Sequence, residues 1–335
     1  MSDTRRGVRL VLTALAVLAA GTGWTVPAFG QDAGQAPSEL EGRVVRGGGM
    51  AGDTARREGL ADLTVELHRV TAGGGEVVDS TVSGPDGAFR FRLADDEEAR
   101  PLYLAAVRYE GIRYFGPALH PGMTNEGPYE IPVYDTSMVS ATPSDLHVGV
   151  RHVVVTPGID GGLDVAEVID VSGPEDRTLV AVSDTLSLWS TALPDGAEDP
   201  QVIEGGAPAD VVRFVGNRVE LGSTLTPLGV RLSYTYRLDG DELELAVEHP
   251  TNRVEVVVAG AEAEVSGASH AETTTRSGRL VHRYEGTALE PGDTIGIKLL
   301  AQGGGVDRWA LVWAVLGLAL LAAAGALAWT GRTTG

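Results

Sequence analysis

One short segment, HRYE at His282 to Glu285, has the spacing with which a zinc site could begin. Such a site needs a third ligand far downstream, and no histidine follows His282 in the chain. The alternation of Leu280, His282 and Tyr284 indicates a strand, on which His282 and Glu285 point to opposite faces. We therefore predict that this segment holds no metal.

Two acidic runs, Asp95 to Glu98 and Asp239 to Glu244, offer the carboxylate oxygens that a calcium ion prefers. Neither run has the alternating ligand spacing of a dedicated calcium loop, and Asp239-Gly240 is typical of a hairpin turn. Solvated acidic turns are the prediction, and calcium binding stays open.

The signatures of nucleotide binding and of hydrolysis are incomplete. Gly47, Gly49 and Gly52 have G-x-G-x-x-G spacing, but the segment that follows leads directly into an alternating strand, so a flexible loop is predicted. The chain has no G-x-S-x-G segment and no supported Ser/His/Asp grouping. We expect no catalytic residue and no cofactor.

Aromatic residues form the one candidate binding surface. Tyr103, Tyr109, Tyr114 and Phe115 lie close together in the sequence, and Tyr109 and Tyr114 flank an expected turn at Gly111. Aromatic rings can stack on a sugar ring or a peptide. The same side chains can instead pack in a core or at a sheet edge, and both interpretations stay open.

The elements that position these residues are predicted to be strands. Apolar and polar residues alternate at residues 62–70 and 88–93, so that Val65 and Leu67 point to one face, as do Phe89 and Phe91. Between them, the segment Pro85-Asp86-Gly87 is typical of a tight turn. Two long apolar runs lie at residues 10–20 and 309–329. Because no stretch between them has a sustained helical period, we predict an all-β fold.

Four segments between residues 39 and 135, namely EGRVVRGGG, GLADLTVELHRV, DSTVSGPDGAFRFRL and LYLAAVRYEGIRYFGP, occur in an order that resembles the carboxypeptidase regulatory-like domain. The matching residues are Gly42, Val44, Gly59 to Leu67, Thr81, Ser83, Asp86, Gly87, Phe89 and Phe91. The resemblance implies a transthyretin-like (prealbumin-like) β-sandwich of about seven strands. It also implies an accessory role, in which the domain stabilises, presents or binds, sometimes to carbohydrate, without hydrolysing.

Residues 137–301 are predicted to form a second β-sandwich domain, for which no family can be named. Several alternating segments are separated by Gly and Pro clusters there. Residues 193–210 are long and polar for a connection, which favours a surface excursion over a mobile binding edge.

The two ends of the chain predict export and anchoring. Three arginines precede the apolar run of residues 10–20, and Ala28 and Gly30 fit a cleavage site, so residues 1–30 read as a signal peptide and 31–38 as a linker. Residues 309–329 are uncharged and long enough to span a bilayer. A Gly-rich hinge at 302–308 and a cytoplasmic tail at 330–335 would flank this transmembrane helix.

Charge and cysteine content narrow the partners and the compartment. The chain carries 26 basic and 46 acidic residues, and without residues 1–30 and 308–335 these become 21 and 45, a net charge of −24. Such a surface repels phosphate backbones, which argues against nucleic acid. The absence of cysteine and of N-x-S/T acceptors fits a bacterial envelope protein better than a secreted eukaryotic one.

Together these observations predict a non-catalytic binding or assembly module, anchored by a single span in the cytoplasmic membrane with its β domains outside the cytoplasm. Its partner would be an envelope protein or a glycan. The alternatives are a carbohydrate-binding ectodomain and a hydrolase with an unrecognised site. The identity of the ligand and the oligomeric state stay open.

Overall fold

The computed structural model describes residues 39–302 except 49–56, 72–73, 94–100, 120–127, 142, 144, 160, 184, 204–206, 208–209, 223 and 277. Within this part of the chain every regular element is a β-strand, which confirms the all-β prediction, and the strands form six sheets. The described part contains no helix whose length and hydropathy would let it cross a bilayer. The expected signal peptide, linker, transmembrane helix and tail lie outside the described residues, as do residues 303–308 of the hinge.

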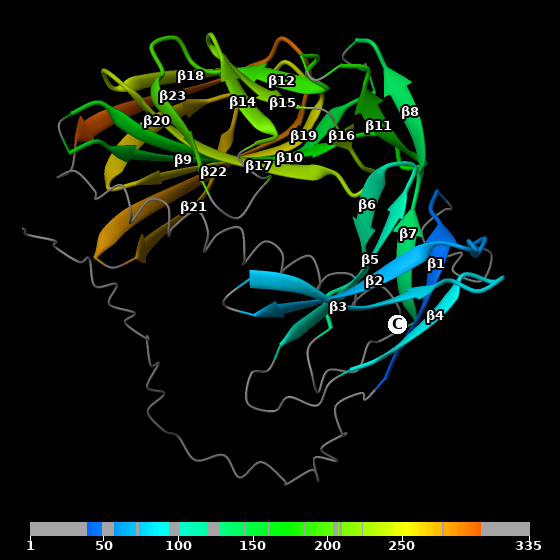
Figure 1. Cartoon of the computed structure of the whole chain (residues 1–335). Coiled ribbons are helices and arrows are strands. Elements are labelled where there is room, and N and C mark those ends of the chain that lie inside the picture. Colours follow the sequence, from blue (N-terminus) through cyan, green and yellow to red (C-terminus); the bar gives the residue numbers. More distant parts are fainter. Residues whose placement is uncertain are drawn as a thin grey trace, which may run out of the picture.

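A first unit consists of seven strands in two sheets (Figure 1). One sheet has the order β4 (Ala88–Arg92), β1 (Glu39–Arg46) and β7 (Tyr129–Val133), with β1 and β7 parallel. The other has the order β3 (Gly74–Val82), β2 (Thr64–Thr71), β5 (Leu102–Tyr109) and β6 (Ile112–Phe115).

The core of the first unit lies between these sheets and uses the residues that the alternation placed inward. Val65 and Leu67 come from β2, and Phe89 and Phe91 from β4; each is at most 5% exposed. The turn before β4 also forms as predicted, because the Gly87 amide donates to the Gly84 carbonyl at 2.8 Å. The local sequence pattern therefore accounts for these core positions and for this turn.

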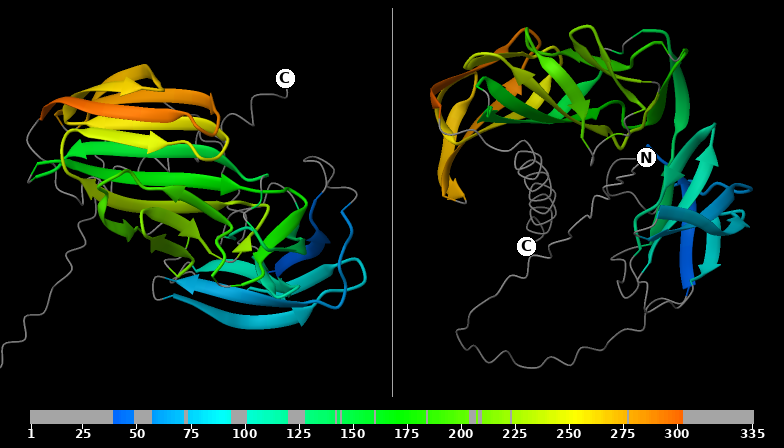
Figure 2. Two further views of the ribbon diagram at one scale, coloured as in Figure 1. Left: turned by 90° about the horizontal axis from the view of Figure 1, so that it is seen from above. Right: turned by 60° about the vertical axis from the view of Figure 1, so that its left-hand side comes forward.

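A second unit is built on a sheet of seven strands, which Figure 2 shows from above. Its order is β13 (Glu198–Val202), β17 (Val230–Leu238), β10 (Leu163–Ser172), β9 (His147–Pro157), β19 (Thr251–Ala259), β22 (Arg279–Leu289) and β21 (Ser269–Arg276). All neighbours are antiparallel except β9 and β19.

Three smaller sheets share a core with one face of the seven-stranded sheet. The first joins β16 (Thr224–Leu225), β11 (Arg177–Ala181) and β8 (Asp135–Val139). The second joins β12 (Trp189–Ala192), β15 (Arg218–Leu221) and β14 (Val212–Val215). The third joins β18 (Glu242–Ala246), β23 (Thr294–Gln302) and β20 (Ala261–Ser266).

Two sequence interpretations in this unit were wrong. Residues 193–210 are not only a loop, because β13 lies within them and adds an edge strand to the seven-stranded sheet. Asp239-Gly240 does form a turn, with Gly240 at φ 89°, but it is no hairpin. It links β17 and β18, which belong to different sheets, because each strand pairs with partners far away in sequence.

The β5–β6 hairpin of the first unit holds the second unit directly. The Tyr109 hydroxyl donates to Asp135 Oδ1 at 2.9 Å, and Glu110 Oε2 accepts from the Thr136 amide at 2.6 Å. The Tyr114 hydroxyl lies 2.7 Å from Thr178 Oγ1 of β11. Since Asp135 and Thr136 begin β8, the place where the chain passes from one unit to the next is fixed by side chains on both sides.

Candidate functional site

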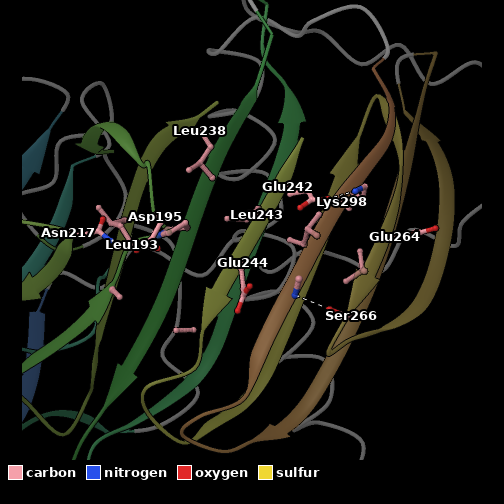
Figure 3. Close-up of a pocket in the computed structure, with 16 residues that line it drawn as sticks. Leu193, Asp195, Asn217, Leu238, Glu242, Leu243, Glu244, Glu264, Ser266 and Lys298 are labelled. Atoms are coloured by element: carbon pink, nitrogen blue, oxygen red, sulfur yellow. Dashed lines mark hydrogen bonds and ion pairs between the residues drawn. The ribbon is translucent and has the colours of Figure 1, made fainter. Parts of the chain in front are cut away.

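The second unit carries an open groove with a volume of about 720 Å³ (Figure 3). The β18–β23–β20 sheet forms its floor, and the end of β12 with the β14–β15 turn forms its wall. The lining residues are Ala192, Leu193, Pro194, Asp195, Asn217, Leu238, Glu242, Leu243, Glu244, Ala246, Glu264, Val265, Ser266, Gly296, Ile297 and Lys298.

A half-exposed ion pair, Arg218–Glu248, joins the wall to the floor. Arg218 of β15 donates from Nη2 and Nη1 to the two carboxylate oxygens of Glu248, at 2.7 and 3.0 Å. Glu248 follows β18 by two residues, and its Oε2 also accepts from the Ala192 amide at 3.0 Å. Burial raises the pKa of Glu248, but the hydrogen bonds from Arg218 outweigh it and leave the pKa below its usual value. This bidentate pair therefore links the β12 and β15 side of the groove to the segment that follows β18.

The floor is acidic because of the strand register. Glu242 of β18 and Glu264 of β20 both stand opposite Lys298 of β23, and Glu244 stands opposite Gly296. The apolar residues between them point into the core. A side chain at Gly296 would crowd β20, because a Cβ there would lie 2.6 Å from Ser266 Oγ.

The groove therefore carries a formal charge of −3, from four carboxylates against one ammonium. Figure 3 shows Asp195 and Asn217 across from Glu244 and from Lys298, which is ion-paired with Glu242. The hydrogen bond to Glu242 raises the pKa of Lys298, so this amine stays charged. A groove of this kind attracts cations.

The predicted aromatic surface does not form one exposed patch. Tyr103 and Tyr114 are only 2% and 3% exposed and belong to the core of the first unit, while Tyr109 is held by Asp135 at the junction. Phe115 alone is open, at 47%, beside His68 at a centroid distance of 5.9 Å. Core and edge packing, the alternative interpretation, accounts for three of the four residues.

The other candidate residues named from the sequence do not come together at one site among the described residues. His282 lies with Tyr284 on the face of β22 that packs inward, whereas Glu285 pairs with Arg283 on the other face, as the alternation predicted. No three His, Cys, Asp or Glu side chains of the described residues gather at one point. Residues 95–98, Gly49 and Gly52 lie outside the described residues.

A buried charged network in the second unit had no sequence signal. Glu167 of β10 is 0% exposed; it accepts from Arg151 Nε at 2.6 Å and from the Tyr236 hydroxyl at 2.8 Å. Arg151 also donates to the Ala246 carbonyl at 3.0 Å, just below the groove floor. Burial lowers the pKa of Arg151, but Glu167 more than compensates, so the pKa of Arg151 lies above its usual value and the guanidinium stays charged. The alternating pattern of these strands predicts apolar residues at such inward positions. The charges of Arg151 and Glu167 are explained only by the contacts that the fold brings together.

A second polar cluster lies on the opposite face of the seven-stranded sheet. Glu255 of β19 contacts His152 Nδ1 at 2.9 Å and Arg283 Nη1 at 3.0 Å, and its side chain is 8% exposed. The hydrogen bond with His152 lowers the pKa of Glu255 to about 2; burial opposes this, and Arg283 contributes to it.

This lowered pKa predicts how acid destabilises the second unit. Because the folded pKa is about 2 against a usual 4.5, the contribution of Glu255 is complete above pH 4.5 and is lost as pH falls from 4.5 to 2. The loss amounts to about 3 kcal/mol. Glu255→Gln removes the carboxylate that titrates. The midpoint of thermal unfolding should therefore depend less on pH in that window for the variant than for the natural chain. Glu285→Gln is the matched control, and parallel acid curves for all three chains would contradict the prediction.

Comparison with known proteins assigns no family. No protein-family model matches the chain, and no curated protein matches it. Among solved structures, an M1 zinc metallopeptidase from Deinococcus radiodurans has a TM-score of 0.30 at 15% identity, over 48% of this chain and 43% of that one. A mutant of it bound to a Tyr-Ser-Ala substrate gives 0.31 at 16%, over 48% and 44%. A protease candidate from Parabacteroides distasonis gives 0.28 at 11%, over 46% and 40%. This chain thus covers less than half of each, and scores this low assign neither a fold family nor an activity.

Proposed function

We propose that this chain is a non-catalytic binding and assembly module, held on the outer side of a bacterial cytoplasmic membrane, and that the acidic groove is where it binds an envelope protein. The observation that carries the proposal is the groove itself. Its floor is a three-stranded sheet, its wall is joined to that floor by the Arg218–Glu248 pair, and its charge is −3.

The groove chemistry favours an extended, positively charged segment as ligand. Glu242 and Glu244 stand two residues apart on β18, about 7 Å along the strand, and alternate side chains of an extended peptide have the same spacing. Asp195, across the groove, has only the Asn217 amide at 3.4 Å as its polar contact among the described residues. Lysine or arginine side chains at every second position would therefore meet carboxylates on both sides of the groove.

The sequence supports the membrane part of the proposal. An apolar run behind three arginines at one end and an uncharged run of residues 309–329 at the other are typical of an exported, anchored chain. The seven strands of the first unit, in two sheets around one core, support the resemblance to the carboxypeptidase regulatory-like domain and hence an accessory role.

A carbohydrate-binding role is the second candidate, and one observation favours it. The exposed ring of Phe115 lies beside His68, and Arg113 on the same strand pairs with Glu66 at 3.3 Å. An open aromatic face next to charged hydrogen-bonding groups suits a sugar ring. The groove is the stronger candidate, because it is a defined hollow whose described lining carries a net charge.

A labelled peptide of alternating lysine and alanine tests the groove. We expect it to bind the full-length protein in neutral detergent and to bind less as salt is raised. Glu244→Gln combined with Glu264→Gln should weaken binding about fivefold, since each exposed ion pair contributes roughly 0.5 kcal/mol. On spheroplasts that carry the full chain, the peptide should bind without permeabilisation.

The matched control removes the same charge elsewhere. Glu39 and Glu41 lie on β1 of the first unit, so changing both to Gln should leave binding unchanged. Equal losses in the two double variants would show that the peptide follows net charge alone, and the groove would then not be the site.

A further inference from the structure

The two edges of the seven-stranded sheet differ in how well they resist pairing with another strand. At one edge, β13 is short, contains Pro200, which has no amide hydrogen, and shifts register between Glu198 and Gln201. Asp199 there has a φ of 49°, which kinks the strand. These features are typical of an edge that is protected against further pairing.

The other edge, β21, lacks this protection over most of its length. Its register shift lies at its start, between His270 and Glu272, and from Glu272 to Arg276 it pairs regularly with β22. All its residues are exposed, and no described strand pairs with its outer side. Figure 1 shows β21 at the rim of the sheet. The peptide groups on this outer side are therefore open to one more strand.

We propose that β21 pairs antiparallel with β21 of a second copy of this chain, about a two-fold axis at Thr274. Charge complementarity selects this partner. In that register Glu272 stands opposite Arg276 of the second copy, and Arg276 opposite the second copy's Glu272. An axis one residue earlier, at Thr273, would leave Glu272 opposite a threonine and Arg276 opposite a histidine.

The contacts around Glu272 and Arg276 leave both side chains available for pairing with a second copy. Glu272 is 54% exposed and reaches only Arg283, at 3.6 Å, while Arg276 forms no ion pair with any described residue. Thr273 and Thr275 would face each other across the dimer, and threonine pairs stabilise antiparallel strands. The dimer thus continues the sheet from one copy into the next, with one self-complementary strand as its interface.

The absence of cysteine from the chain allows a direct test. Thr274→Cys places one thiol on the axis, where the two Cα atoms are about 5 Å apart, within disulfide range. Mild oxidation of the full-length chain, in the cells that produce it, should yield a disulfide-linked dimer. Ser269→Cys is the control on the same exposed strand; its two copies would lie about 33 Å apart. We expect at least about tenfold less dimer from it.

Charge variants test the register independently. Glu272→Arg and Arg276→Glu each bring like charges together, so either change should lower cross-linking through Thr274→Cys. Producing both variants together should restore it, because only the mixed dimer then has two opposite-charge pairs. Equal cross-linking of the two cysteine variants, no cross-linking of Thr274→Cys, or no recovery in the mixture would overturn the proposal.

Discussion

Replacing Glu167 by Leu is expected to destabilise the second unit by about 3–5 kcal/mol, because Arg151 is then a buried cation without its counter-ion. Arg151 has a side chain only 6% exposed, and apart from Glu167 it has only neutral neighbours, the Ala246 carbonyl at 3.0 Å and the Tyr234 side chain among them. For a chain of this size the midpoint of thermal unfolding should fall by roughly 10 °C. Tryptophan fluorescence, to which Trp189 in the same buried core contributes, reports the transition together with circular dichroism.

Two controls separate the buried charge from ordinary loss of contacts. Arg151→Met combined with Glu167→Leu removes both charges and should recover most of the loss, since an apolar pair can replace a buried ion pair. Glu41→Ala breaks a pair with Arg90 in which both side chains are more than 60% exposed, and should cost less than about 1 kcal/mol. If the double variant were as unstable as Glu167→Leu, the shape of the side chains and not the charge would be the cause.

Gly87→Ala is expected to destabilise the first unit by about 2–5 kcal/mol. Gly87 has a φ of 79°, which costs other residues about 1–2 kcal/mol. A Cβ there would also lie 2.2 Å from the Val44 carbonyl oxygen, and crowding of this kind adds about 1–3 kcal/mol. The clash is with backbone, so no side chain can turn away from it. Faster hydrogen exchange in β1 and β4 would measure the loss.

Gly111→Ala provides the matched comparison. Gly111 has nearly the same φ, 84°, but nothing lies within 4 Å of the Cβ that alanine would add. This variant should therefore lose only the conformational part, about 1–2 kcal/mol. Equal effects at the two glycines would mean that the close approach of Val44 contributes nothing.

The sequence predicted correctly those structural features that depend on only a few neighbouring residues. Alternation placed Val65, Leu67, Phe89 and Phe91 in the core, and Pro85-Asp86-Gly87 indicated the turn that precedes β4. These features depend on strand period and on backbone preferences that neighbouring residues determine. The face of β22 on which His282 lies follows from the same period.

The groove and the charged core could not be predicted in this way. Glu242, Glu264 and Lys298 are brought together by pairing among β18, β20 and β23, and Glu167 meets Arg151 only because β9 and β10 share a register. Strand partners depend on the whole topology, which local patterns do not encode. The tyrosine pattern left two interpretations open for a related reason, because it does not distinguish an open face from a packed one.

The parallel pairing of β9 with β19 determines when the second unit can fold. Val153 to Val155 of β9 align with Val256 to Val258 of β19, which is synthesised about a hundred residues later. Until that later segment is available for pairing, the valines of β9 lack one neighbouring strand and remain open to aggregation. The unit should therefore complete its folding late and depend on chaperones at that stage, even though its finished sheet is well packed.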